Sequence, residues 1–287
     1  MRTDSISIVC AGDRTFIMPI KVMLKSLLVN TRSEVQVFIL STGWGEAEKK
    51  RFDELVLSHK NVRIHFLDIP KEKCPKAFKV TGNITIETYY RLFIPQELPQ
   101  SIEEVIYLDG DIIVEGDIRK LWEIPMKNCA VMAVPEMFHD AHRVSSPLAL
   151  NTYADLGIPG ERKYFNAGVL KINLKKWREE KIPQKILAYL EEYRDKVLWH
   201  DQDGLNAVLW KDWSELPYEW NVMTALFHEK DYRKIDMDEK TAKDLMASPQ
   251  IIHYTNSREK PWKDSCTHPL KSRFQYYKEL LTEKEKV

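Results

Sequence analysis

Strand and helix patterns alternate through the first third of the chain, and this alternation limits the possible folds more than any other feature of the sequence. Residues 5–11, 35–40 and 62–67 are short, apolar and partly β-branched, which is typical of buried strands. Apolar residues at helical spacing fill the two intervals between them, residues 16–28 and 45–58. This β-α-β-α-β order predicts an α/β fold whose central sheet is mostly parallel and carries helices on its faces.

Composition excludes several classes of protein. The 287 residues, 44% hydrophobic and 30% charged, suffice for one large domain. Forty-three basic residues balance 43 acidic ones, so we expect no field that gathers nucleic acid. The N-terminal apolar run, residues 6–11, is too short for a signal peptide or a membrane span. The four cysteines form no CxxC pair, which argues against a zinc site and favours a reducing cytoplasm.

The sequence Asp109-Gly110-Asp111 directly follows an apolar strand pattern at residues 105–108. Ligands of such sheets collect at the carboxyl ends of strands. A turn at Gly110 brings the two carboxylates close enough to share one hard cation. Mg²⁺ or Mn²⁺ held in this way stabilises a diphosphate leaving group, as sugar transfer from a nucleotide diphosphate requires. Asp-Gly-Asp is also ordinary turn chemistry, which is the competing interpretation.

His253 and Lys260 are candidates for the same site. His253 ends the apolar strand pattern at residues 250–252, and an imidazole beside two carboxylates suits Mn²⁺ better than Mg²⁺. Lys260 lies near enough in sequence to reach a β-phosphate and offset its charge. A structural histidine and a solvated surface lysine are the alternatives.

Six motifs in a fixed order extend the pattern over nearly the whole chain. They are IVCAGD (8–13), ETYYRL (87–92), VIYLDGD (105–111), YFNAGVL (164–170), DQDGLN (201–206), and HY (253–254) with KPW (260–262). Together they resemble the family 8 retaining glycosyltransferases, a group that contains glycogenin and bacterial lipopolysaccharide galactosyl- and glucosyltransferases. The resemblance implies a single GT-A, Rossmann-like domain that binds a nucleotide diphospho-sugar, over residues 1–260, with a helical, aromatic and basic extension at 261–287.

The resemblance also implies roles for individual residues. The expected metal ligands are Asp109, Asp111 and His253. The expected donor-binding residues are Ala11, Asp13, Thr15, Phe16, Arg91, Asn166, Asp201, Gln202, Asn256 and Lys260. Within these, Ala11 and Asp13 would meet uracil, Phe16 would stack on it, and Arg91 would neutralise phosphate or orient the sugar.

The expected catalytic residues are Asp201, Gln202 and Asp203. The resemblance places Asp201 on donor hydroxyls and Gln202 near the anomeric carbon, and Asp203 would be a weak nucleophile or an electrostatic partner of the oxocarbenium-like centre. Asp201 is also a good helix N-cap. Two departures from the family pattern concern the donor contacts. Asn256 replaces a usual glycine, with Lys260 seven rather than six positions beyond His253, and Thr15 replaces a usual asparagine.

We therefore expect a retaining hexosyltransferase that uses UDP-glucose or UDP-galactose with Mn²⁺, or Mg²⁺. Its acceptor would be a glycan, a glycolipid or a lipopolysaccharide, bound by residues 81–85 and the proline-rich, polar interval 136–162. A haloacid dehalogenase-like phosphatase acting through Asp109 and a non-catalytic UDP-sugar-binding protein are the alternatives. A dinucleotide-binding oxidoreductase would need a GxGxxG motif, which residues 11–15 lack.

The C-terminal tail mixes aromatic and basic residues, among them Trp262, Phe274, Tyr276, Tyr277 and Arg273. This combination suits peripheral contact with an anionic membrane surface, on the inner face of the membrane for a cytoplasmic protein. The alternative is a C-terminal helix that packs its aromatic residues on the domain.

Overall fold

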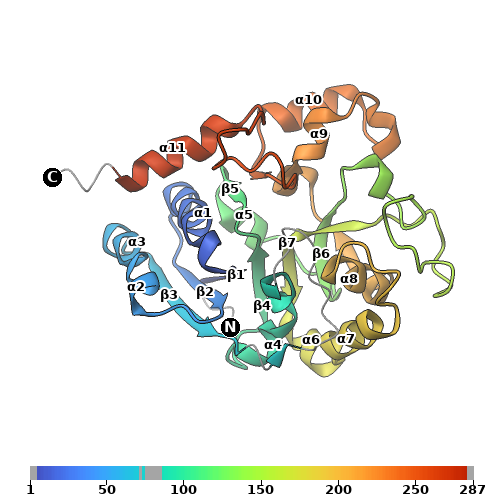
Figure 1. The fold of residues 1–287 in the computed structure, drawn as a ribbon, viewed down its shortest axis with the longest axis horizontal. Helices are drawn as coiled ribbons and strands as arrows, with labels where there is room; N and C mark the ends of the chain where they lie inside the picture. The colour runs from blue at the N-terminus through green and yellow to red at the C-terminus, as the bar shows by residue number, and fades with distance from the viewer. Residues whose placement is uncertain (1–4, 71–72, 75–85, 283–287) are drawn as a thin grey trace.

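A seven-stranded sheet forms the centre of the molecule (Figure 1). The computed structural model describes residues 5–70, 73–74 and 86–282. The strand order is β3-β2-β1-β4-β7-β6-β8, so β4 lies in the middle. The strands are β1 (Ile6–Ala11), β2 (Val35–Ser41), β3 (Val62–Asp68), β4 (Glu104–Leu108), β6 (Val131–Pro135), β7 (Phe165–Asn173) and β8 (Trp213–Glu215).

Strand direction determines which loops meet at the edge of the sheet. β3, β2, β1 and β4 pair in parallel, and β7 runs antiparallel to both of its neighbours, β4 and β6. Leu108 at the end of β4 pairs with Val169, and the Asp109 amide donates to the Gly168 carbonyl at 2.9 Å. The beginning of β7 therefore lies beside the carboxyl end of β4. The expected α/β fold with a mostly parallel sheet is confirmed.

A second, small sheet has the order β5-β10-β9. β10 (Ile251–His253) pairs antiparallel with β5 (Ile112–Val114) and parallel with β9 (Val222–Met223). The register places His253 opposite Ile112, directly after Asp111. The small sheet thus brings a histidine from the C-terminal part of the chain to the acidic turn after β4.

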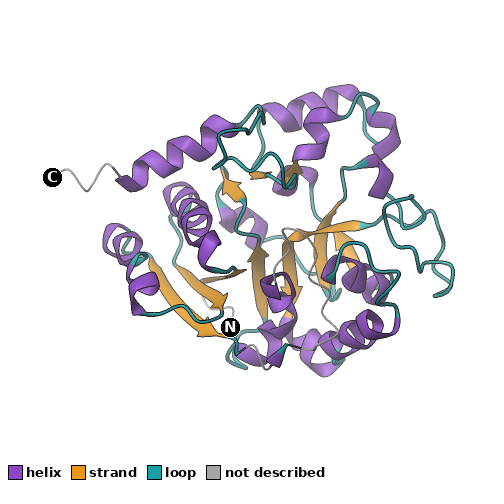
Figure 2. Ribbon diagram, viewed as in Figure 1, coloured by secondary structure: helices purple, strands orange, loops and turns teal. Residues whose placement is uncertain are grey.

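Helices cover both faces of the large sheet (Figure 2). Alternate residues of β1 belong to two separate buried clusters, Ile8 and Cys10 to one, Val9 and Ala11 to the other, as expected for a strand buried on both faces. The α-helices are α1 (Ile17–Asn30), α2 (Glu46–Lys50), α3 (Asp53–Ser58), α4 (Ile94–Glu97), α5 (Ile118–Trp122), α6 (Leu174–Glu179), α7 (Ile182–Glu192), α8 (Asp201–Leu209), α9 (Thr224–His228), α10 (Glu239–Ala247) and α11 (Lys271–Thr282). The 3₁₀ helices are η1 (Arg14–Phe16), η3 (Ile86–Phe93), η4 (His139–Ala141), η5 (Tyr218–Asn221) and η6 (Tyr232–Ile235).

Two predicted helices differ in detail from the structure. The single helix expected over residues 45–58 is divided into α2 and α3, and between them Phe52 is buried against Trp44 and Phe66, with ring centroids 5.8 and 5.5 Å away. The helix expected over residues 88–95 is mainly the 3₁₀ helix η3, whose residues from Tyr89 to Phe93 are all buried. Tertiary packing overrides the local pattern in both places.

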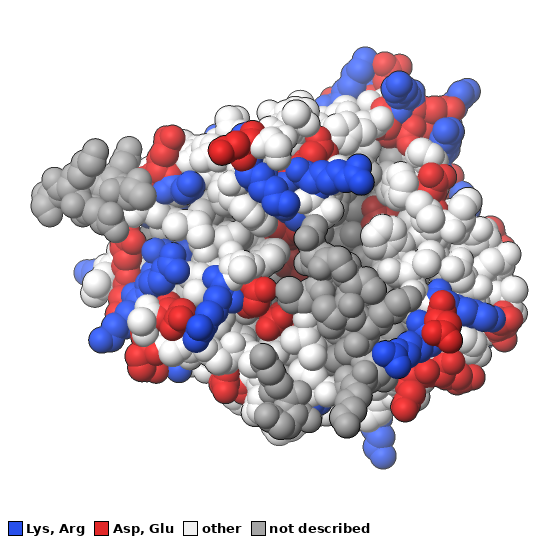
Figure 3. All heavy atoms as spheres, viewed as in Figure 1, with Lys and Arg blue, Asp and Glu red and all other residues white. Residues whose placement is uncertain are grey.

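The C-terminal helix α11 packs along α1. Phe274 and Tyr277 are buried, and the Asn30 side-chain amide donates to the Tyr277 hydroxyl at 2.8 Å. Tyr276 is 44% exposed, so of these three aromatic residues only Tyr276, on the outer face of the helix, remains available for the expected membrane contact. That contact stays a prediction. In the part of the chain that the structure describes, no helix is long and apolar enough to cross a membrane. Basic and acidic side chains alternate over the face in Figure 3, where acidic atoms are visible in a central hollow.

Candidate active site

Three potential metal ligands meet at the carboxyl end of β4. Asp109 follows β4, Asp111 precedes β5, and His253 ends β10, and one ligand atom from each lies within 4.8 Å of the others. His253 Nε2 is 3.3 Å from Asp111 Oδ1 and 3.8 Å from Asp109 Oδ2. Carboxylate oxygens with an imidazole nitrogen form a donor set that fits a divalent cation such as Mn²⁺. The structure therefore brings together the three residues that the sequence indicated.

Two glycines leave the room that this cluster needs. A Cβ on Gly168 would lie 2.1 Å from His253 Cε1 and 2.9 Å from Asp109 Oδ2. A Cβ on Gly110 would lie 2.9 Å from the Phe16 ring. The backbone of β7 thus passes directly behind the ligands, closer than any residue with a side chain allows.

Lys260 reaches the cluster despite its altered spacing from His253. Its ammonium group donates to Asp111 Oδ2 and to the Tyr254 carbonyl. Burial by itself would raise the pKa of Asp111, but Lys260 and then His253 hold this pKa well below its usual range. Asp111 is therefore ionised at neutral pH, as a metal ligand must be.

Arg91 connects the acidic turn to helix α8. Its Nη2 donates to Asp109 Oδ1 at 2.9 Å, and its Nε is 2.8 Å from Asp201 Oδ2. The guanidinium also lies over the Tyr107 ring, 4.3 Å from its centre, and Tyr107 donates its hydroxyl to Asp109 Oδ1 at 2.9 Å. Burial raises the pKa of Asp201 to about 7, although the Arg91 charge opposes this shift. Arg91 thus compensates two carboxylates that lie on different elements.

Replacing Arg91 with methionine should lower the free energy of unfolding by about 3–5 kcal/mol at pH 8, because it leaves Asp201 buried without its partner. The folded-state pKa of Asp201, already above its unfolded value, would rise further. Ionisation of the buried Asp201 lowers stability, and this loss grows as pH rises from the pKa of Asp201 in the unfolded protein to its pKa in the folded protein. The difference in stability between Arg91→Met and wild type should therefore be smaller at pH 5 than at pH 8. Urea denaturation of both proteins at pH 5 and pH 8 measures this difference in the free energy of unfolding.

Arg119→Met is the control, because Arg119 and Glu123 form a half-exposed i,i+4 pair, which contributes below about 1 kcal/mol. Equal losses in the two variants would contradict the assignment.

The turn before α8 is strained and held by Asp203. His200 has a φ of 54°, a left-handed conformation that favours glycine. The buried Asp203 accepts from the amides of Leu198 and Trp199 at 2.7 and 3.1 Å, and from the Tyr164 hydroxyl at 2.6 Å. Burial raises the pKa of Asp203 in spite of these bonds. They favour a structural role for a residue expected to be catalytic, and its catalytic role stays a prediction.

Gln202 differs from the aspartates on either side of it. Asp201 and Asp203 are each 1% exposed, whereas Gln202 is partly exposed. The Gln202 Oε1 atom accepts from the Ala167 amide at 2.8 Å, which ties the first turn of α8 to the beginning of β7. Of these three expected catalytic residues, Gln202 thus has the most exposed side chain.

The residues expected to bind the uridine lie at the end of β1. Ala11 ends this strand, and Asp13 Oδ1 accepts from the Thr15 and Phe16 amides at 2.7 and 3.2 Å. Phe16 is partly buried, with its ring 5.6 Å from that of Trp262 in an edge contact. Since Phe16 also packs against Gly110, this group adjoins the acidic turn, and its contacts with uracil stay a prediction.

Two expected donor contacts are engaged with the protein itself. The exposed Asn256 donates to Glu259 Oε2 at 3.0 Å and accepts from the Arg258 amide. The buried Asn166 donates to Glu136 Oε2 at 2.9 Å and accepts from the Gly168 amide. Their donor-binding roles stay predictions.

Sequence reasoning missed two polar residues of this region. Asn221 Oδ1 accepts from His253 Nδ1 at 2.9 Å, and Tyr107 bonds Asp109 as described above. Asn221 lies in a stretch without a motif, so nothing in the sequence singled it out. Tyr107 stands within the apolar strand pattern before Asp109, where a buried aromatic is unremarkable by itself.

The interval expected to bind the acceptor forms a segment between β6 and β7. Its histidines contact carboxylates from the C-terminal part of the chain: His139 Nδ1 is 2.7 Å from Glu229 and His142 Nε2 is 3.3 Å from Asp236. Arg143 donates to Asp236 as well, at 2.6 Å. The other part of the expected acceptor region, residues 81–85, lies outside the described residues.

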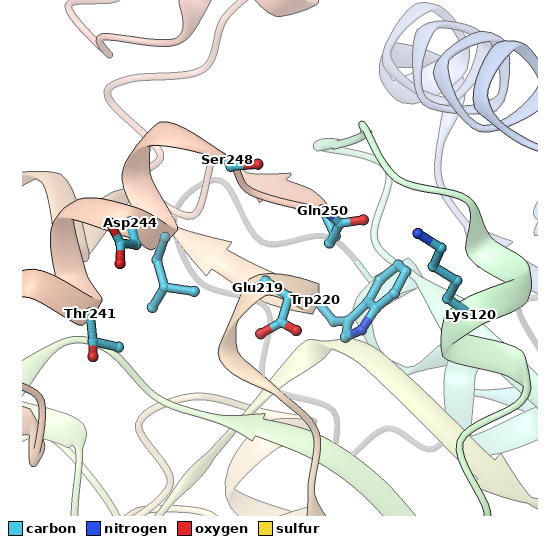
Figure 4. A pocket seen from close by; sticks show the side chains of 8 residues that line it. Lys120, Glu219, Trp220, Thr241, Asp244, Ser248 and Gln250 are labelled. Atoms are coloured by element: carbon cyan, nitrogen blue, oxygen red, sulfur yellow. The ribbon is translucent and has the colours of Figure 1, made fainter.

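A cavity of about 520 Å³ opens elsewhere, at the other end of β10 (Figure 4). Gln250, which directly precedes β10, lines it, whereas His253 at the end of β10 does not. The other lining residues are Lys120, Glu219, Trp220, Thr241, Asp244, Leu245 and Ser248. This cavity is therefore separate from the carboxylate cluster.

The chain is similar in sequence and fold to several known proteins. Residues 7–266 match the sequence model of glycosyl transferase family 8. The chain is 31% identical over 283 residues to general stress protein A of Bacillus subtilis (strain 168), covering 96% of this chain and 94% of that protein. It is 25% identical to lipopolysaccharide 1,2-glucosyltransferase of Escherichia coli (strain K12), covering 97% and 78%. Among solved structures it resembles galactosyltransferase LgtC in complex with donor and acceptor sugar analogs, with a TM-score of 0.81, 26% identity and 96% of each chain covered.

Proposed function

The chain belongs to glycosyl transferase family 8 and is a glycosyltransferase, and from this premise we propose that it transfers a hexose from UDP-glucose or UDP-galactose with retained configuration. The observation that carries the proposal is the cluster of Asp109, Asp111 and His253 at the carboxyl end of β4. Such a cluster, flanked by Lys260 and Arg91, is suited to a donor that carries a diphosphate.

In this proposal, Asp109, Asp111 and His253 hold Mn²⁺, or Mg²⁺. The ion would supply positive charge against the diphosphate that leaves. Lys260, whose ammonium already lies at Asp111, would contact the same phosphates. Because the divalent ion offsets the two carboxylates and Lys260 adds a further positive charge, the diphosphate would meet a site of net positive charge.

The protein's own side chains would position the sugar. Arg91 holds Asp109 and the first turn of α8 in one arrangement, so the diphosphate and the hexose are oriented by one rigid unit. Asp201 would bond hydroxyls of the sugar, and the partly exposed Gln202 would lie near its anomeric carbon.

The acceptor is proposed to be a glycan, a glycolipid or a lipopolysaccharide. The name of the Escherichia coli relative and the acceptor analog bound in the LgtC structure support this class. The segment between β6 and β7 would contact it, since that segment starts and ends at the site edge of the sheet. We place the reaction in the cytoplasm, with α11 as the candidate contact to the membrane.

The purified protein with Mn²⁺ should release UDP from one of UDP-glucose and UDP-galactose faster than from other nucleotide sugars, which a coupled UDP assay measures. The donor that is hydrolysed identifies the sugar. Protein treated with EDTA and then dialysed is the control. UDP binding in calorimetry without release from any donor, with or without added oligosaccharide acceptors, would support a non-catalytic UDP-sugar-binding protein. If the protein neither binds UDP nor releases it from any donor, the proposal is contradicted.

A further inference from the structure

We propose that Asn221 is a positioning residue that fixes the tautomer and the ring orientation of His253, so that Nε2 presents its lone pair toward Asp109 and Asp111. The inference rests on the proposed function in one respect, which is that the proposed metal ion would bind the Nε2 lone pair. The tautomer itself can be measured without any metal or substrate.

Asn221 belongs to a buried chain of hydrogen bonds that begins at His253. Asn221 Oδ1 is 2.9 Å from His253 Nδ1, and Asn221 Nδ2 donates to Asn166 Oδ1 at 3.0 Å. Asn166 Nδ2 donates to Glu136 Oε2 at 2.9 Å. Asn221 is 0% exposed, and the other three residues are at most 8% exposed. Such low exposure makes a wrongly oriented amide costly.

Hydrogen-bond chemistry fixes the direction of every bond in this chain. The Gly168 amide, which can only donate, lies 2.9 Å from Asn166, so the Asn166 atom that faces it must be oxygen. The Asn166 nitrogen then faces Glu136, whose carboxylate oxygens accept every hydrogen bond described here. The same Asn166 oxygen requires a nitrogen from Asn221. The remaining Asn221 atom, its oxygen, faces His253 Nδ1, and this ring nitrogen therefore carries the proton.

The alternative tautomer is a real competitor at this position. His253 Nε2 is 3.3 Å from Asp111 Oδ1, so a proton on Nε2 would be attracted by the carboxylate and would block the lone pair. Asn221 counters this by offering an acceptor to Nδ1 only. Groups that orient a metal-ligating histidine through its other nitrogen typically change metal affinity about 10- to 100-fold when they are replaced.

The backbone makes Asn221 a rigid support. It ends η5 and directly precedes β9, and β9 pairs in parallel with β10 through Val222 with Ile252 and Met223 with His253. The Thr224 hydroxyl also donates to the His253 carbonyl at 3.3 Å. Asn221 therefore directly precedes one strand of the small sheet and His253 ends the adjacent strand, which sets the distance between them.

The chain of bonds also reaches the segment expected to bind the acceptor. Glu136 directly follows β6, and its Oε1 accepts from the Met137 and Phe138 amides at 2.9 and 3.1 Å. One chain of hydrogen bonds through Asn221, Asn166 and Glu136 thus links the histidine to the first turn of that segment. Asn221 is the member that touches His253 directly, so its replacement tests the positioning role most cleanly.

Two variants and one control test the proposal. Asn221→Leu removes the acceptor at similar size, whereas Asn221→Asp keeps an acceptor for Nδ1–H and faces Asn166 Oδ1 with a second oxygen. Asn30→Leu is the control, since Asn30 is a partly buried asparagine that bonds the Val114 carbonyl and Tyr277, neither of which belongs to the cluster. Mn²⁺ titration without donor is the first readout, and ¹⁵N NMR of the His253 ring in metal-free protein is the second.

We expect Asn221→Leu to bind Mn²⁺ about 10- to 100-fold more weakly and to shift the His253 proton to Nε2. Asn221→Asp should keep the Nδ1–H tautomer and stay within about threefold of the wild-type Mn²⁺ affinity, even where its stability falls, because its carboxylate can replace the amide oxygen as acceptor. Asn30→Leu should lower stability only.

A folded Asn221→Leu protein with unchanged tautomer and Mn²⁺ affinity would overturn the proposal. If that variant does not fold, loss of the Nδ1–H tautomer in Asn221→Asp would overturn it instead. Wild-type protein that shows the Nδ1–H tautomer but no Mn²⁺ binding would count against the proposed function and not against this inference.

Discussion

Replacing Asp109 with asparagine is expected to reduce sugar transfer by about 10³-fold at saturating donor and Mn²⁺, because a metal ion contributes several kcal/mol of charge stabilisation to the transition state. The amide keeps the size of the side chain but loses the charge that Arg91 and the metal share. Initial rates of UDP formation measure the loss. EDTA treatment of the wild type should lower the rate to a similar level, and added Mn²⁺ should restore it.

The matched control is Asp244→Asn, since Asp244 is an exposed aspartate on α10 whose partner is Lys240. This variant should keep the wild-type rate. Circular dichroism shows whether Asp109→Asn is folded, which matters because Arg91 loses one of its two carboxylate partners. A folded Asp109→Asn protein that retains more than a tenth of the wild-type rate would contradict the metal site.

A single methyl group at Gly168 should disable the site almost as completely, with Mn²⁺ affinity falling at least about 100-fold, beyond the usual effect of supporting residues. A Cβ there would lie 2.1 Å from His253 Cε1, a distance at which one of the two must move. The backbone has little freedom to move, because β7 is paired with β4 on one side and with β6 on the other. The imidazole would therefore be displaced from the carboxylates.

Gly45→Ala is the control for this change, because the nearest atom to its new Cβ is the end of the flexible Glu48 side chain, at 3.1 Å. Overpacking at Gly168 also costs about 1–3 kcal/mol of stability, so thermal unfolding is recorded with each Mn²⁺ titration. Wild-type Mn²⁺ affinity in a folded Gly168→Ala protein would show that the ligands lie elsewhere.

Much of the fold was predictable because the strands are buried on both faces and therefore appear as continuous apolar runs. β1 and β4 are of this kind, and the acidic residues after β4 were correctly expected at the edge of the sheet. Strand direction was not predictable for β7, because an apolar run is the same when read in either direction. That reversal is what places Asn166 and Gly168 at the site.

Short and non-local features were beyond the reach of sequence patterns. The strands of the small sheet have only two or three residues each, too few for periodicity. His253 could be proposed because it ends an apolar run, but its support from Asn221 depends on a pairing between β9 and β10. The phosphatase interpretation of Asp109 does not fit a member of glycosyl transferase family 8.

The strand pairing at the base of the segment between β6 and β7 has a consequence for how such enzymes diversify. Pro135 pairs with Phe165, so residues 136–164 leave the sheet and return to it at neighbouring positions on two bonded strands. A segment anchored in this way can be shortened, lengthened or exchanged without shifting the register of either strand. In the acceptor role proposed for this segment, exchange of the residues between Phe138 and Tyr164 would change acceptor preference, while Glu136 and Tyr164, which bond Asn166 and Asp203, stay in place.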